Sequence, residues 1–136
     1  MIEQSELVLP PMPKGFHLIT DKILANIGKL PETGIINIFL HHTSAGLVIS
    51  ENADPTVRKD LNTIFDDLAP ENCPEYTHTL EGADDMPAHI KSALTGVSVT
   101  IPILHSKLKL GTWQGIYLCE FRNLGGPRKM TISIFS

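Results

Sequence analysis

The sequence predicts a single α+β domain of about seven strands, largely antiparallel, with two or three helices. Short runs rich in branched apolar residues recur along the whole chain and are bounded by turn-forming residues, as strands usually are. Two segments instead place apolar residues at helical spacing behind a capping residue. The 136 residues are an ordinary size for one domain, 42% of them are hydrophobic, and no repeat or linker divides them. We therefore expect residues 1–136 to form one domain.

The first expected elements are a strand or arm, a second strand and a helix. Residues 2–9 partly alternate between polar and apolar side chains, and residues 15–19 have the composition of a strand. Thr20 or Asp21 can cap a helix that continues to about Lys29. The apolar face of this helix consists of Ile23, Leu24, Ile27 and Leu30.

Two central strands are expected to form a hairpin. Residues 35–42 and residues 47–51 are both rich in branched apolar side chains, and residues 43–46 between them have the composition of a turn. Because consecutive strands joined by a short turn commonly pair, we expect these two to be neighbours. Alternation places on one face of the first strand Ile36, Ile38, Leu40 and His42.

The middle of the chain contains two further helix signals. Asp54 precedes Pro55, which is a favoured helix start because aspartate caps the helix and proline suits its first position. Pro70 ends this helix, and after a polar loop Asp84 or Asp85 can cap a shorter one. The apolar face of the first of these helices consists of Val57, Leu61, Ile64, Phe65 and Leu68.

The C-terminal part of the chain reads as three strands. They cover residues 97–103, 113–122 and 129–135, and the segments 108–111 and 125–127 between them have the composition of turns. These strands bring the expected total to about seven.

Composition argues against several classes of partner. The net charge is −4 and the basic residues are scattered, so we expect no nucleic acid to bind. No apolar run approaches the roughly 20 residues of a membrane span, and the N-terminus lacks the features of a signal peptide. Cys73, in a loop, and Cys119, in a strand, form no metal motif and are expected to be free thiols. A cytoplasmic protein without a membrane partner is the expectation.

Histidines suggest a metal site. His41 and His42 end a strand, and alternation sends them to opposite faces, so they cannot easily share an ion. His78 and His89 enclose three acidic residues, and imidazole and carboxylate groups are the usual ligands of zinc and similar ions. Their spacing matches no tight zinc motif, and a solvated acidic loop before a capped helix is the alternative.

Two more stretches combine polar side chains with defined geometry. Glu51 and Asn52 precede a helix N-terminus, a position that attracts anions, although a plain capping loop is the alternative. Alternation along residues 113–122 places Gln114, Glu120 and Arg122 on one face. A ligand site and a structural ion pair between Glu120 and Arg122 are both compatible with this pattern.

These stretches carry a resemblance to a known family. The sequence contains the strings HHTSAG, ENADP, EGADDMPAHIK and LGTWQGIYLCEFR, and from about Phe16 to the C-terminus it resembles the YjbQ-like family, also called uncharacterised protein family UPF0047. The resemblance implies an α+β sandwich that assembles as a homotrimer. It also implies secondary thiamine-phosphate synthase activity, which joins a pyrimidine pyrophosphate to a thiazole phosphate and releases pyrophosphate.

The resemblance further implies roles for particular residues. It implies a divalent metal ion, zinc or magnesium, with Glu81, Glu120 or water completing a coordination shell formed by His42, His78 and His89. The implied catalytic residues are Glu120, Glu51, Gln114 and Ser44. The residues implied to bind a small phosphorylated metabolite are Thr43, Asn52, Lys91, Trp113, Arg122 and Arg128.

Three functions are compatible with these features. The first is thiamine-phosphate synthesis, in which Trp113 or Tyr117 stacks on the pyrimidine, although the chain has no glycine-rich phosphate loop. The second is a metal-dependent hydrolase of another small substrate, with Glu51 or Glu120 as base. The third is a non-enzymatic module that binds a metal or metabolite. Metal content of the pure protein, together with any density beside His42, would discriminate: metal with an ordered phosphate favours the first function, metal with water alone leaves the second open, and neither favours the third.

Overall fold

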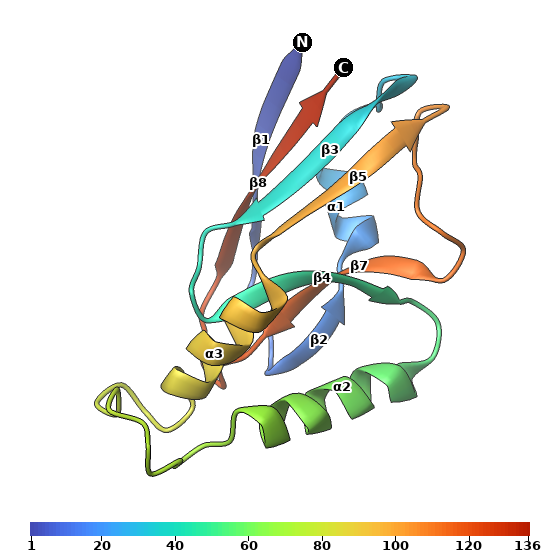
Figure 1. Ribbon diagram of the computed structural model, residues 1–136. Helices are drawn as coiled ribbons and strands as arrows, with labels where there is room; N and C mark the ends of the chain where they lie inside the picture. Colours follow the sequence, from blue (N-terminus) through green and yellow to red (C-terminus); the bar gives the residue numbers. More distant parts are fainter.

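The computed structural model describes all 136 residues and contains eight strands in two antiparallel sheets (Figure 1). The larger sheet contains, in spatial order, β1 (Ile2–Leu9), β8 (Arg128–Phe135), β3 (Thr33–Leu40), β5 (Ser98–Leu104) and β6 (Lys107–Leu108). The smaller sheet contains, in spatial order, β2 (Gly15–Leu18), β7 (Gln114–Glu120) and β4 (Ala45–Glu51). The predicted α+β class is confirmed, and no helix is long and apolar enough to cross a membrane.

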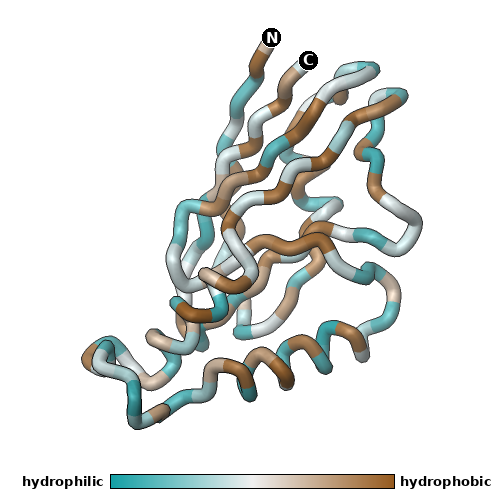
Figure 2. The backbone as a smooth tube through the Cα atoms, viewed as in Figure 1, coloured by the Kyte–Doolittle hydropathy of each residue, from teal (hydrophilic) through white to brown (hydrophobic).

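The main core lies between the two sheets. Strand β3 contributes Ile36, Ile38 and Leu40, which are all nearly inaccessible and follow the predicted alternation. From the smaller sheet, Ile116 and Leu118 of β7 belong to the same buried cluster. Figure 2 shows the corresponding change between apolar and polar positions along the strands of the larger sheet. The two sheets therefore form a sandwich around one shared core.

The predicted hairpin between the two central strands is wrong. Strand β3 pairs with β5 on one edge and with β8 on the other, whereas β4 pairs with β7 in the smaller sheet. Both edges of β3 are therefore occupied. On the β5 side the pairing continues to the bond that Leu40 N donates to Val97 O, and on the β8 side to the bond that His41 N donates to Lys129 O. The segment 41–44, which includes His41 and His42, crosses from the larger sheet to the smaller one.

Helix boundaries agree with the sequence except at the first helix. Helix α2 (Pro55–Leu68) begins as predicted, because the Asp54 carboxylate accepts a bond of 2.9 Å from Thr56 N. Helix α3 (Asp85–Thr95) is the predicted shorter helix. Helix α1 (Thr20–Asn26) has Ile19 at its N-cap rather than the predicted Thr20 or Asp21, because the Thr20 hydroxyl accepts from Ile116 N instead. It ends before the predicted Lys29, because Ile27 is already extended. The segment 108–111, predicted as a turn, includes the end of the two-residue strand β6.

The smaller sheet is covered on its second face by α2 and α3. Phe16 and Phe121 make edge-to-face and stacked contacts with Phe65 of α2, and Tyr117 and Cys119 of β7 belong to the same small cluster. Strand β7 is thus buried on both faces. Burial raises the pKa of the Cys119 thiol, and both cysteines are free, as predicted.

Candidate metal site and the polar network around it

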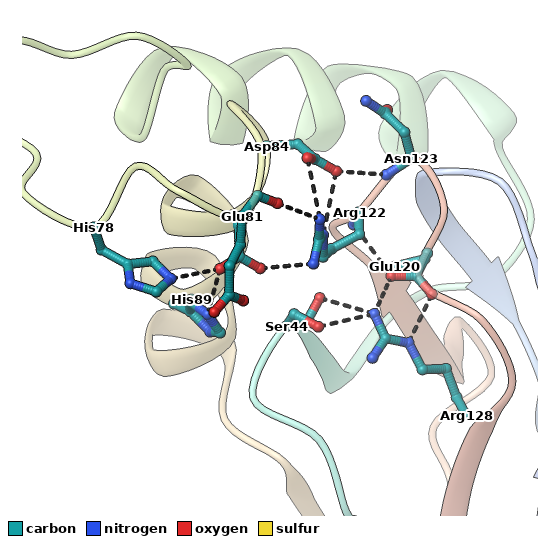
Figure 3. Close-up of polar contacts among 10 residues, drawn as sticks. Ser44, His78, Glu81, Asp84, His89, Glu120, Arg122, Asn123 and Arg128 are labelled. Atoms are coloured by element: carbon teal, nitrogen blue, oxygen red, sulfur yellow. Dashed lines mark hydrogen bonds and ion pairs between the residues drawn. The ribbon is translucent and has the colours of Figure 1, made fainter.

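Helix α3 brings two histidines and one aspartate together. Asp85 and His89 are four residues apart and therefore share one face of the helix, with Asp85 Oδ2 3.0 Å from His89 Nε2. His78, from the loop before α3, approaches the same carboxylate oxygen with its Nε2 at 2.6 Å. The potential ligand atoms of His78, Asp85 and His89 all lie within 4.8 Å of one another. We call these three residues the His–Asp group; Figure 3 shows both histidines.

The hydrogen bonds of His89 fix the orientation of its ring. Its Nδ1 lies 2.8 Å from the carbonyl oxygen of Thr43, which can only accept, so Nδ1 carries a proton and donates it. Its Nε2 faces a second acceptor, the carboxylate of Asp85. His89 Nε2 and this carboxylate therefore form a pair that can hold a proton or a metal cation between them. An Nδ1–H bonded to a carbonyl is also how ligating histidines are commonly oriented in metal sites.

Arg122 holds the other oxygen of Asp85. Its Nη1 is 2.8 Å from Asp85 Oδ1, and its remaining donors reach Asp84 and the carbonyl oxygen of Glu81 (Figure 3). Burial opposes ionisation of Asp85, but the bond from His78 and the charges of His89 and Arg122 outweigh it and lower the pKa of Asp85. Arg122 therefore positions a carboxylate that is ionised at neutral pH.

A second, fully buried ion pair lies beside this network. Arg128 donates to Glu120 through Nε at 2.7 Å and through Nη2 at 2.5 Å, and both side chains are at most 3% exposed. Nη2 also donates to the carbonyl and hydroxyl oxygens of Ser44. A Cβ on Gly125 would lie 2.5 Å from both members of the pair, so this glycine is required for close packing.

The pairing of Glu120 differs from the sequence-based alternative of an ion pair with Arg122. Strand β7 ends at Glu120, so the alternation does not continue to Arg122. The backbone N–H of Arg122 donates to Glu120, but its guanidinium turns to Asp84 and Asp85. The sequence pattern includes Asp84 and Asp85 among three acidic residues near the histidines but does not single out Asp85 as a ligand. The sequence signal for a role of Asp85 beside His89 is its position four residues earlier on the same helix.

His42 lies outside the His–Asp group. Its Nε2 accepts a bond of 2.8 Å from the backbone N–H of Lys129, so this nitrogen is not free to bind a metal ion. Burial and the positive charge of Arg128 lower the pKa of His42, which keeps the ring neutral. The geometry thus favours Asp85 over His42 as the third ligand of an ion bound to His78 and His89.

A cavity of about 540 Å³ adjoins His89. It lies between the end of β3, the segment 41–44 and α3, and it combines polar groups of His41 and His42 with the apolar side chains of Phe39 and Val97. Its size and mixed lining suit a small metabolite. A molecule bound there would be next to the His–Asp group.

Four of the residues assigned by resemblance lie at the far end of the smaller sheet. Strand β4 pairs with β7 so that Ala45 faces Glu120 at one end and Glu51 faces Gln114 at the other, about 20 Å away. There, Asn52 donates to Thr112 and to Gln114. The Glu51 carboxylate accepts from the backbone N–H groups of residues 53 and 54, and Trp113 is 65% exposed. Within one chain these residues do not reach the His–Asp group.

The remaining assigned residues are divided between the two sides of α3. Thr43 contributes its carbonyl oxygen to His89, and Ser44 contacts Arg128. Glu81 is exposed and contributes only its carbonyl oxygen, to Arg122. Lys91 is buried on another face of α3, where it bonds to Asp66.

The neutrality of His42 predicts a pH dependence of stability. Because its pKa is lower in the folded protein than its ordinary value of 6.5, folding favours the neutral ring. The resulting contribution of His42 to the free energy of unfolding is complete above about pH 6.5 and is lost as the pH falls towards the folded-state pKa. The His42→Gln variant, which keeps an acceptor near the Lys129 N–H, should lose less stability than wild type between pH 7.5 and 5.5 in urea unfolding. His105→Gln is the control, since His105 is exposed; equal losses in all three proteins would contradict the assignment.

Fold and site together define the class of protein: a small two-sheet α+β protein with a potential metal site at the N-terminal end of its third helix. The family model for UPF0047 protein YjbQ-like matches residues 5–136, and the chain belongs to this family. UPF0047 protein YjbQ of Salmonella typhimurium is 50% identical over 133 residues, and its relative in Escherichia coli O157:H7 is 44% identical over 133 residues; each alignment covers 96% of both chains.

Solved structures show the same fold. The conserved hypothetical protein TT1486 from Thermus thermophilus superposes with a TM-score of 0.83 at 38% identity, covering 94% of this chain and 97% of that chain. The YbjQ-like protein of unknown function SSO2532 from Sulfolobus solfataricus has a TM-score of 0.85 at 24% identity, covering 100% and 98%. The resemblance seen in the sequence motifs is confirmed, and the family is one of unknown function.

Proposed function

We propose that the protein is a divalent-metal-dependent enzyme that acts on a small phosphorylated metabolite. The observation that supports the proposal is the position of His89, whose two ring nitrogens both face acceptors, so that His89 Nε2 and the Asp85 carboxylate can share a cation. A second imidazole, from His78, faces the same oxygen. Two histidines and one carboxylate match the donor set of catalytic zinc sites, which have three protein ligands, whereas structural zinc sites have four.

The proposed ligands are His78, Asp85 and His89, with Arg122 orienting the carboxylate. An ion bound to them would supply Lewis-acid chemistry, which stabilises negative charge on a departing phosphate or pyrophosphate. This contribution is needed because the nearby arginines are already paired, Arg122 with Asp84 and Asp85, and Arg128 with Glu120. The chain's own side chains therefore offer little free positive charge to such a leaving group.

A hydrogen-bond donor near the cavity supports a phosphorylated substrate. His42 accepts at Nε2, so its Nδ1 carries the proton and is available as a donor. This Nδ1–H can bind a phosphate oxygen. The apolar wall of the cavity, formed by Phe39, Val97 and neighbouring residues, suits a heterocyclic ring.

The reaction we propose to assay first is thiamine-phosphate synthesis from a pyrimidine pyrophosphate and a thiazole phosphate. It requires stabilisation of pyrophosphate and a binding surface for a flat ring, and the His–Asp group and the cavity supply these two features. A hydrolase of another phosphorylated metabolite is the second candidate. It is favoured by the three-ligand donor set, which is typical of sites where a further position is open to water or substrate.

Elemental analysis and turnover test the proposal together. The protein purified without chelator is expected to contain about one zinc or similar ion per chain, and thiamine phosphate should form from the two substrates, as measured by mass spectrometry. Chelator should abolish both the metal content and the product, and His89→Ala should do the same. His105→Ala, which removes an exposed histidine, should leave both unchanged. A protein that binds no metal after incubation with zinc would overturn the proposal. If metal binds but no thiamine phosphate forms, the hydrolase remains as the candidate function, and phosphomonoesters are the substrates that test it.

We also propose that the protein is a homotrimer, as the resemblance implies. The isolated chain exposes 7634 Å², whereas a monomer of 14.9 kDa typically exposes about 7,000 Å². On the larger sheet, Ile2, Phe135 and Ile35 are neighbours across three strands and are 40–59% exposed. A contiguous apolar row of this kind is typical of an interface.

Light scattering coupled to gel filtration tests the assembly. Wild type is expected to elute at about three times the chain mass of 14.9 kDa. Ile35→Glu places a charge in the apolar row and should dissociate the trimer, whereas Leu80→Glu, in an exposed loop, should not. A monomer mass for wild type at micromolar concentration would contradict the proposal.

A further inference from the structure

A second pocket lies on the other side of α3 from His89. His89 and Lys91 are two positions apart, which separates them by about 200° around the helix. The pocket has a volume of about 320 Å³. Its walls come from segments far apart in the sequence: Lys14 before β2, Asp66 on α2, Lys91 on α3 and Phe121 after β7. Helix packing therefore builds this pocket, which we call the lysine pocket.

Two lysines of the pocket share one carboxylate. Asp66 Oδ1 lies 2.7 Å from Lys14 Nζ and 2.5 Å from Lys91 Nζ. Burial opposes ionisation of Asp66, but hydrogen bonds from both lysines outweigh it and lower the pKa of Asp66. Of the two other acids on the wall, Asp84 is already paired with Arg122, and Glu71 is exposed and forms no ion pair. Two ammonium groups therefore converge on one carboxylate, that of Asp66, and the lining as a whole carries no excess of positive charge once Glu71 is counted.

Lys91 is unusual in its burial. Its side chain is 3% exposed, and fully buried lysines are rare unless they are paired. The ammonium group has three N–H donors, but within the chain it has a single acceptor, Asp66 Oδ1. Its other close neighbour is the ring of Phe121, whose centroid is 5.9 Å from Nζ. An ion pair that served only to join α2 to α3 would not need a second lysine on the same oxygen.

We propose that the lysine pocket is a second ligand site, which binds a small oxyanion such as inorganic phosphate or the phosphate group of a monoester between Lys14 and Lys91. Asp66 is 43% exposed and can turn towards solvent when the anion enters. The volume of the pocket accommodates a phosphate with a small substituent. The site involves none of the His–Asp group and is independent of the proposed metal.

Backbone amide NMR with inorganic phosphate tests the proposal on the full-length, metal-free protein. Wild type should show saturable shifts at Asp66, Lys91 and Phe121. Asp66→Asn removes the competing negative charge and should bind phosphate roughly tenfold more tightly, whereas Lys14→Met should bind roughly tenfold more weakly. Lys107→Met is the matched control, since Lys107 is exposed on β6 and forms no ion pair. It should bind as wild type does.

Several results would overturn the proposal. One is the absence of saturable shifts at these residues in both wild type and Asp66→Asn at millimolar phosphate. Another is weaker phosphate binding by Asp66→Asn, which would mean that the carboxylate acts only as a structural partner of the lysines. Shifts confined to His42 and Lys129 would assign the anion to the cavity beside His89 instead. The Lys14→Met variant changes a half-exposed residue in a loop, so its fold, checked by circular dichroism, should persist.

Discussion

Replacement of Asp85 by asparagine is expected to weaken zinc binding at least a hundredfold. The substitution keeps the shape of the side chain and removes the negative charge that faces His78 and His89 through a single oxygen. It also leaves the guanidinium of Arg122 without its partner at Oδ1, which adds an uncompensated positive charge beside the site. Competition with a chelator of known affinity measures the loss. Asp67→Asn, on the exposed face of α2, is the control and should bind zinc as wild type does.

The outcome also decides between two states of the His–Asp group. If the cation between His89 and Asp85 is only a proton, wild type and Asp85→Asn will bind zinc equally weakly. Asp85→Asn will then change the stability of the fold, through the lost hydrogen bonds to His78 and His89, without changing metal binding. That pair of results would contradict the proposed metal site and assign the three residues to a hydrogen-bonded cluster.

Glu120→Gln is expected to destabilise the fold strongly, with the melting temperature falling by roughly 10–20 °C. Glu120 is fully buried and both of its oxygens accept bonds from Arg128, so the variant leaves a buried guanidinium without its counter-charge. Breaking such a pair by removing one partner typically costs about 3–5 kcal/mol. Thermal and urea unfolding measure the change. Glu3→Gln, on the exposed side of β1, is the control.

Removal of both charges provides a second test of this ion pair. The double variant Glu120→Leu with Arg128→Met is expected to lose less stability than Glu120→Gln alone, because neither charge remains buried without a partner. If Glu120→Gln instead keeps the wild-type melting temperature but loses turnover, Glu120 acts in catalysis, as the resemblance implied.

Local sequence was sufficient for most elements of this fold. Asp54 before Pro55 predicts the start of α2 because a cap and a fixed φ act within one turn. Alternation over Ile36, Ile38 and Leu40 predicts the buried face of β3 because strand periodicity is a property of consecutive residues. The motifs around His42, His89 and Gln114 also suffice to show the family.

Tertiary structure alone decided which strands pair and which polar groups meet. Strand β4 is close to β3 in sequence, but β3 has only two edges and both are taken by strands that are distant in sequence. Glu120 pairs with Arg128 rather than with the side chain of Arg122 because β8 brings Arg128 to the end of β7, where alternation stops. Periodicity describes the face of one element, whereas hydrogen-bond partners depend on the packing of several. For this reason the sequence indicated the histidines, and only the fold placed Asp85 between them.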